Sequence, residues 1–154
     1  MKSEDLMKIL ANHSNWLNGK GSGSKANLAD ADLTDVKTND ATYGFWLACP
    51  EVGSFIAFKK AHEKIVVLEI PADARRSSAT SLKCRCDKAK VLRIENLDGS
   101  LSSLSEIASD FDSNFVYKVG EIVSVDDFDT NRWVECSAGI HFFISRQLAV
   151  NYIR

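Results

Sequence analysis

Short β-type segments separated by turn residues dominate this chain from Tyr43 onward, and they limit its fold more than any other feature. Aromatic and β-branched residues fill the segments, and Pro or Gly residues separate several of them. Strands are expected at 43–49, 54–59, 64–70, 88–95 and 139–145, with a helix starting at 146. Because helices do not alternate with these strands, the pattern predicts an α+β fold with a strand-rich mixed or antiparallel sheet.

The first 42 residues have a different character. Ser3 can cap a helix over 3–18, in which apolar residues recur at three- and four-residue spacing. The Gly/Ser run 19–24 ends this helix and is flexible by composition. The sequence therefore predicts an N-terminal segment, 1–42, before an α+β domain, 43–154.

Charge is distributed unevenly along the 154 residues, although the net charge is only -2. Segment 72–93 carries seven basic and two acidic residues, whereas segment 95–135 carries ten acidic and two basic residues. The small net charge argues against binding of double-stranded nucleic acid by the whole protein. The local charge can attract an anion, or the two segments can simply be solvated faces that balance each other.

The four cysteines and the absence of a long apolar run suggest where the protein works. No segment approaches the roughly 20 apolar residues that a membrane-spanning helix needs, and no signal peptide is recognisable. Reduced thiols in a cytoplasmic protein without a membrane partner are therefore expected. Cys84 and Cys86 are too close together for the usual zinc spacing, so neither a metal nor a cofactor is predicted.

The strongest candidate for anion binding lies in the basic segment. Arg75 and Arg76 precede Ser77, Ser78 and Thr80. Arginine side chains bind phosphate bidentately, and hydroxyl and backbone N–H groups can complete a cradle for it. The alternative is a capped helical turn whose two arginines pair with Asp73 or with the acidic loop. Arg85, in the same segment, is a further candidate ligand-binding residue.

A second group of candidates lies between residues 132 and 144. His141 and Phe143 would share one face of a strand and could contact a ligand, and Trp133 could stack on a base. Cys136 and His141 could act as nucleophile and base, or Glu135 could be the base. The alternatives are core packing for Trp133, a structural histidine at 141, and a solvated turn for the acidic run 126–129.

Two tandem five-residue units, 26–30 and 31–35, have leucine at their centres and look like a vestigial pentapeptide-repeat coil, although a turn-rich connector is the alternative. With these units, segments 12–17, 49–55, 70–80, 84–92 and 117–152 resemble an uncharacterised family of domains found downstream of pentapeptide repeats in phage and bacterial proteins. The resemblance implies a phage or prophage origin, and thus a host bacterial cytoplasm, but no activity.

The C-terminal segment carries a local likeness to a second family. Residues 139–143, with Ala149 and Tyr152, are similar to a Gly-Ile-Tyr-Phe…Ala…Tyr segment of ADP-ribosyltransferases. The likeness implies a strand and helix that line a pocket for an ADP-ribose-like ligand. The glutamate that those enzymes carry on a later strand has no counterpart before Arg154, and segment 43–49 lacks their first-strand His or Arg. Transferase activity is therefore not expected.

Taken together, these features favour a non-enzymatic binding protein of phage type. It would sequester an anionic, nucleotide-derived signalling molecule as a counter-defence and immune-evasion protein, and it would be a homo-oligomer. One alternative is an enzyme that cleaves a nucleotide or phosphodiester signal with His141 as acid or base and Glu135 or Cys136 assisting. Another is an inhibitor that binds a host defence protein through the acidic loop.

Overall fold

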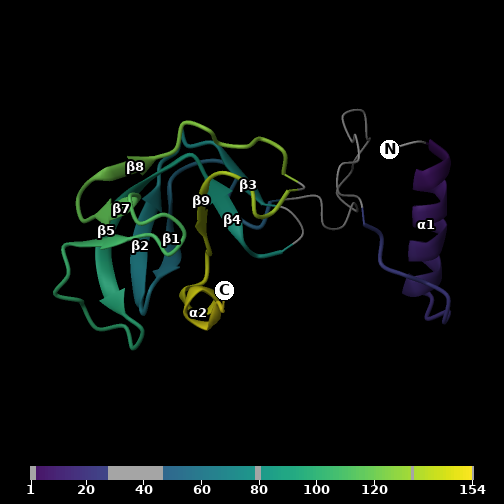
Figure 1. Ribbon diagram of the computed structural model, residues 1–154, viewed down its shortest axis with the longest axis horizontal. Coiled ribbons are helices and arrows are strands. Elements are labelled where there is room, and N and C mark those ends of the chain that lie inside the picture. Colours follow the sequence, from purple (N-terminus) through teal and green to yellow (C-terminus); the bar gives the residue numbers. More distant parts are fainter. Residues whose placement is uncertain (1–2, 28–46, 79–80, 133, 154) are drawn as a thin grey trace. The chain divides into compact units, whose positions relative to one another are not determined.

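The computed structural model describes residues 3–27, 47–78, 81–132 and 134–153 (Figure 1). The chain forms two compact units, 1–42 and 43–154. The five-residue units from Leu28 onward, most of the strand expected at 43–49, Thr80 and Trp133 lie outside the described residues, and residues 47–49 are not in a strand.

The first unit contains one helix and a segment that folds back on it. Helix α1 spans Ser3–Leu17, and the chain turns away from it at Gly19, which has a φ of 66°. Lys20 N donates to Asn15 O at 2.9 Å, and Gly19 N donates to Trp16 O at 3.1 Å. This is the paired bonding of a Schellman motif, which favours glycine at the left-handed position. A Cβ on Gly23 would lie 2.0 Å from Trp16 N, so glycine is required where the Gly/Ser run passes the helix backbone.

A four-stranded antiparallel sheet forms the larger part of the second unit. It contains β1 (Phe55–Ala61), β2 (Lys64–Ile70), β5 (Lys88–Asn96) and β8 (Ile122–Ser124) in the order β1-β2-β5-β8. The strand expected at 64–70 from its β-branched residues is β2, with the same bounds, and these residues are buried almost throughout. The predicted strand-rich, antiparallel α+β fold with an N-terminal helix is confirmed.

A three-stranded antiparallel sheet contains β3 (Arg76–Ser78), β4 (Cys84–Cys86) and β9 (Ile140–Phe142) in the order β3-β4-β9. The helical turn considered for this basic segment is wrong, because β3 pairs with β4 along its whole length. Only Asp87 separates β4 from β5, so the chain passes there from one sheet to the other. Phe58 and Phe143 exchange two backbone hydrogen bonds of 2.8 Å, which also join the two sheets.

The remaining elements cover the sheets. Strands β6 (Glu106–Ala108) and β7 (Val116–Lys118) pair antiparallel, and helix α2 (Arg146–Asn151) packs on β1 and β2. Buried apolar side chains from both larger sheets form one core, with Tyr117, Phe142, Ile70, Leu68, Val91 and Ile94 among its largest members. No helix within the described ranges has the length and apolar character needed to cross a membrane.

Candidate functional site

A row of three polar side chains crosses the three-stranded sheet. Ser77 of β3 lies opposite Arg85 of β4, and Arg85 lies opposite His141 of β9. Directly paired residues of antiparallel strands project from the same face, with their Cβ atoms about 5 Å apart. The neighbouring positions, Cys84 and Phe142 among them, project from the other face into the core. The sheet register therefore gathers Ser77, Arg85 and His141, which are 64 positions apart at their extremes, into one site.

Arg85 is the most unusual residue of the row, because its side chain is charged and only 2% exposed. Its Nη2 donates to the backbone oxygen of Asn131, but its Nη1 is buried and has no hydrogen-bond partner. No ion pair among residues 47–78, 81–132 and 134–153 includes Arg85, whereas a buried arginine is normally paired. Burial lowers the pKa of Arg85, and the charge of Asp129 opposes that shift.

An aromatic ring and a glycine fix the position of this guanidinium. Arg85 Cζ lies 5.6 Å from the centroid of the Phe128 ring, and Arg75 Cζ lies 5.1 Å from the same centroid. Gly139 has a φ of 149°, and a Cβ there would lie 3.2 Å from both Cβ and Cδ of Arg85. The backbone at Gly139 thus packs directly on the arginine side chain, and residues 128–132 and 134–139 provide the segment that covers the row.

Ser77, the cross-strand partner of Arg85, has a second buried polar atom without a partner in the described part of the chain. The residue is 4% exposed, and its Oγ is buried without a hydrogen-bond partner. Nearly all buried polar groups in proteins are hydrogen-bonded, so two unpaired groups on one cross-strand pair need an explanation.

His141, the third member of the row, is partly buried and neutral near pH 7. Burial lowers its pKa to about 4, and the charges of Lys59, Lys83 and Arg85 act in the same direction, against a hydrogen bond with the Glu135 backbone. The ring Nε2 lies 3.1 Å from Glu135 O, and Lys59 Nζ donates to His141 O at 3.4 Å. Three cationic groups therefore surround an uncharged imidazole.

The expected catalytic candidates Glu135 and Cys136 lie at the edge of the same site. Lys83 Nζ donates to the exposed Cys136 Sγ at 3.2 Å, and Ser81 Oγ donates to Glu135 Oε1. Burial alone would lower the pKa of Lys83, but the bond to Cys136, with the charges of Tyr152, Cys136 and Glu135, raises it. The structure thus places the Cys136 thiol, the Lys83 ammonium group and the His141 ring in one region. The His141 ring contacts the backbone oxygen of Glu135 and not its carboxylate.

The two arginines that the sequence places first in a phosphate cradle have partners within the chain. All five donors of the Arg76 guanidinium bond to backbone oxygens, namely those of Ala74, Pro50, Gly53, Pro71 and Ala72. Arg75 pairs through Nε with Asp87 Oδ2 at 2.8 Å. We therefore leave Arg76 out of the site and place Arg75 at its border, where it contacts Phe128.

The other sequence candidates fall into three groups. Ser78 Oγ accepts a hydrogen bond of 2.8 Å from Ala48 N and so holds the preceding segment to the sheet. The Phe143 ring packs 5.3 Å from the Tyr152 ring, next to α2. Thr80 and Trp133 are not among the described residues. Of the predicted set, Arg85, Ser77 and His141 are the residues that the sheet brings together.

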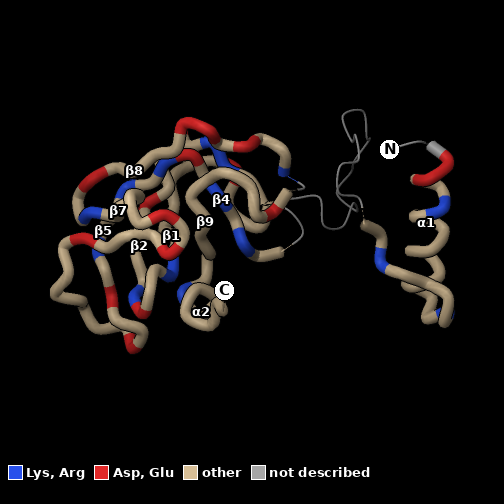
Figure 2. Tube along the Cα trace, viewed as in Figure 1, with Lys and Arg blue, Asp and Glu red and all other residues tan. Residues whose placement is uncertain are grey.

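The rest of the second unit also carries charge and a surface hollow. In Figure 2 basic residues gather around β4, whereas acidic residues mark several connecting loops. A surface hollow of about 750 Å³ lies between Lys60, His62, Asp110 and Tyr152. Three of its polar side chains have partners within the chain, since His62 Nδ1 lies 3.0 Å from Asp110 Oδ1 and Lys60 Nζ donates to backbone oxygens. In the described part of the chain, no three His, Cys, Asp or Glu side chains gather as a metal site would require.

Comparison with known proteins identifies a family but no activity. No curated protein and no solved structure matches the chain. Residues 45–149 match the model of a family of unknown function, DUF5758, and this match includes both larger sheets and the Ser77–Arg85–His141 row. The chain therefore belongs to DUF5758.

Proposed function

We propose that the second unit binds a small anionic ligand through Arg85 and does not turn it over. The observation that carries this proposal is the buried Nη1 of Arg85, to which the described residues give neither a hydrogen-bond acceptor nor a carboxylate in ion-pair contact. Taking an unpaired charge out of water costs several kcal/mol, on the order of the whole margin of stability of a domain. A ligand oxyanion at Nη1 would supply the missing charge and the missing acceptor together.

Entry of this anion requires the covering segment to move. The backbone oxygen of Asn131 holds Arg85 Nη2, and Gly139 packs on the aliphatic part of the same side chain. Both belong to the segment that covers the row, so a ligand has to displace part of it. Lys59 and Lys83, which lie close enough to His141 to lower its pKa, add positive potential along the way in.

We propose a nucleotide-derived signalling molecule, sequestered in a bacterial cytoplasm as a phage counter-defence, in a homo-oligomer. It is supported by the resemblance to pentapeptide-associated phage domains and by the local likeness of residues 139–152 to ADP-ribosyltransferases. A phosphate of such a molecule is the group that would meet Arg85.

Thermal unfolding of the whole chain with mono-, di- and cyclic nucleotides, ADP-ribose derivatives and simple anions tests the proposal. A ligand at about 100 times its dissociation constant adds about 2.7 kcal/mol to the free energy of unfolding. Arg85→Met should abolish the shift. Arg75→Met is the matched control, because Arg75 contacts the same Phe128 ring but is paired with Asp87, and it should keep the shift. Loss with Arg75→Met but not with Arg85→Met would restore the cradle interpretation, and no shift with any anion would overturn binding.

One observation favours an enzyme as the second candidate. The exposed Cys136 Sγ accepts a hydrogen bond of 3.2 Å from Lys83 Nζ, and the neutral His141, whose Nε2 lies against the backbone of Glu135, can accept a proton. The bound compound should be recovered by denaturing the complex and analysed by mass spectrometry. Intact recovery supports a binding protein. A cleaved product whose formation stops in Cys136→Ser or His141→Gln would establish the enzyme.

A further inference from the structure

The two nitrogens of the His141 ring have different roles, and this difference restricts which anion the site can accept. Nε2 lies 3.1 Å from the backbone oxygen of Glu135. A carbonyl oxygen only accepts hydrogen bonds, so Nε2 must carry the hydrogen of the neutral ring. Nδ1 then carries a lone pair and acts as an acceptor, and no described residue donates to it.

A residue that needs an acceptor and a residue that offers one therefore project from the same face of the sheet. Arg85 Nη1 needs an acceptor, and His141, its direct cross-strand partner on β9, offers one at Nδ1. An oxyanion without hydrogens, such as sulfate or a dialkyl phosphate, satisfies Arg85 but points lone pairs at the imidazole. A ligand that also carries a hydroxyl or N–H group beside the anion satisfies both residues.

We infer that the ligand of the proposed Arg85 site is an oxyanion with a hydroxyl or N–H donor next to it, and that His141 is the residue that selects for this donor. Sugar phosphates and hydroxy acids both present this chemistry. The inference rests on the proposed function, since it assumes that an anion binds at Arg85. It adds a requirement that neither the net charge nor the Arg85 geometry imposes alone.

Two matched pairs of small anions test the inference by titration calorimetry on the whole chain. Glycerol 2-phosphate and isopropyl phosphate differ only in hydroxyl groups, as do lactate and propionate. The hydroxylated member of at least one pair should bind about tenfold more tightly, which is the contribution of one well-placed hydrogen bond to an otherwise unsatisfied group. Preference within the first pair identifies a phosphate ester as the ligand class, and preference within the second identifies a hydroxy acid.

Variants of His141 separate selection from simple structural support. His141→Phe should bind both members of a pair equally, whereas His141→Gln should keep the preference, because its amide can donate to Glu135 O while its oxygen accepts from the ligand. Far-ultraviolet circular dichroism checks that both variants are folded. Equal binding within both pairs by the unaltered chain would overturn this inference and leave the Arg85 site standing. Failure of every anion to bind, the four probes included, would overturn the proposed function itself.

Discussion

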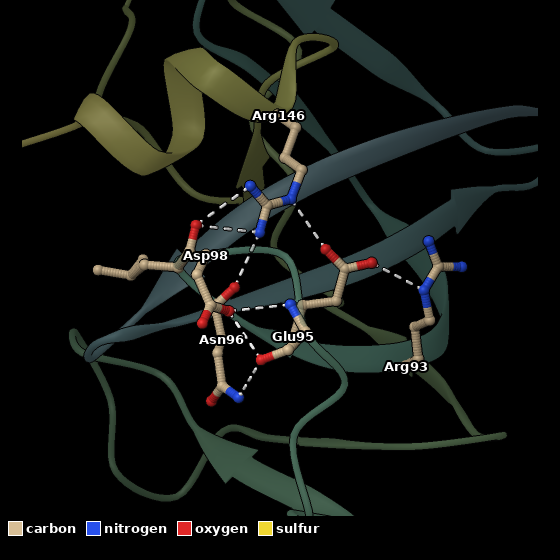
Figure 3. A network of polar contacts seen from close by, with 7 residues as sticks. Arg93, Glu95, Asn96, Asp98 and Arg146 are labelled. Carbon is tan, nitrogen blue, oxygen red and sulfur yellow. Dashed lines mark hydrogen bonds and ion pairs between the residues drawn. The ribbon is translucent and has the colours of Figure 1, made fainter.

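The two larger sheets of the second unit each bury a charged side chain. On one sheet the charge is paired with opposite charges, and on the other it has no ion pair among the described residues. On the four-stranded sheet, Glu95 of β5 is 7% exposed and its two carboxylate oxygens receive Arg93 Nε and Arg146 Nε, each at 2.8 Å (Figure 3). The Arg146 guanidinium also donates to the backbone oxygens of Asn96 and Leu97. On the three-stranded sheet, Arg85 is buried more deeply and has one hydrogen bond to a backbone oxygen.

This difference separates a structural network from the site proposed for an anion. Burial alone would raise the pKa of Glu95, but hydrogen bonds and charges from Arg146 and Arg93 outweigh it and hold that pKa below its usual value. The network is therefore complete within the chain, and it ties helix α2 to the turn after β5. The Arg85 row is incomplete within the chain. Breaking the first should destabilise the fold, whereas altering the second should change binding.

The largest effect is expected for Arg146→Met. It leaves the buried Glu95 carboxylate with one partner and frees the oxygens of Asn96 and Leu97, and loss of one partner of a buried ion pair typically costs about 3–5 kcal/mol. Arg93→Met should cost less, because Arg93 is about half exposed and Arg146 remains bound to Glu95. Urea unfolding measures both. A further Glu95→Gln change should recover part of the Arg146→Met loss, and a loss no larger than that of Arg93→Met would contradict a closed network.

Gly139→Ala should be the next most damaging change, and it acts on the segment packed against Arg85. Alanine must adopt a φ of 149° there, and its Cβ would lie 3.2 Å from Arg85 and 3.3 Å from Phe128 Cδ2. Backbone strain and overpacking together should cost about 2–3 kcal/mol. Gly120→Ala is the control, because Gly120 has a φ of 90° but open space around it. An equal loss in both variants would show that the close packing of Gly139 on Arg85 contributes nothing.

The pH dependence of stability should report the neutral His141. Its pKa is about 4 in the folded chain against an ordinary 6.5, so the unfolded chain takes up the proton first as pH falls. Stability is then fully present above about pH 6.5 and declines towards pH 4, with a loss of about 2 kcal/mol between pH 7 and pH 5. Urea unfolding of the unaltered chain and of His141→Gln at pH 7, 6 and 5 isolates this contribution. Parallel curves for the two proteins would exclude a lowered pKa.

Local patterns in the sequence predict much of the regular structure but little of the three-stranded sheet. Segment 64–70 is β-branched and buried, so its strand is evident, and α1 follows from apolar spacing and an acidic first turn. Strands β3 and β4 contain Arg, Ser and Cys in runs of three residues, without an alternating apolar pattern. They become strands because they pair with each other and because β4 also pairs with β9. The pairing of β4 with β9 joins segments far apart in the sequence and therefore leaves no local signal.

The candidate site shows the same limit at the level of single residues. Arg75, Arg76 and Arg85 are equivalent in the sequence as members of one basic segment. All donors of Arg76 bond to backbone oxygens, which include those of Pro50 and Gly53, more than 20 positions away, whereas Arg85 bonds to Asn131 O and has no described partner at Nη1. Residue type predicts that an arginine here can bind an anion. Which arginine remains unpaired depends on the register of β3, β4 and β9.

The smallest expected change in stability, and the one that divides the two regions most clearly, is that of Arg85→Met without ligand. Methionine keeps the aliphatic contact with Gly139 and removes a buried charge that forms no ion pair within the described residues, and replacing such a charge by an apolar side chain is often neutral or stabilising. We expect a change within about 0.5 kcal/mol or a gain, against the several kcal/mol lost in Arg146→Met. Urea unfolding of the two variants under identical conditions makes the comparison. A loss for Arg85→Met as large as that for Arg146→Met would make Arg85 part of the scaffold, because an arginine kept for binding is dispensable to the unliganded fold.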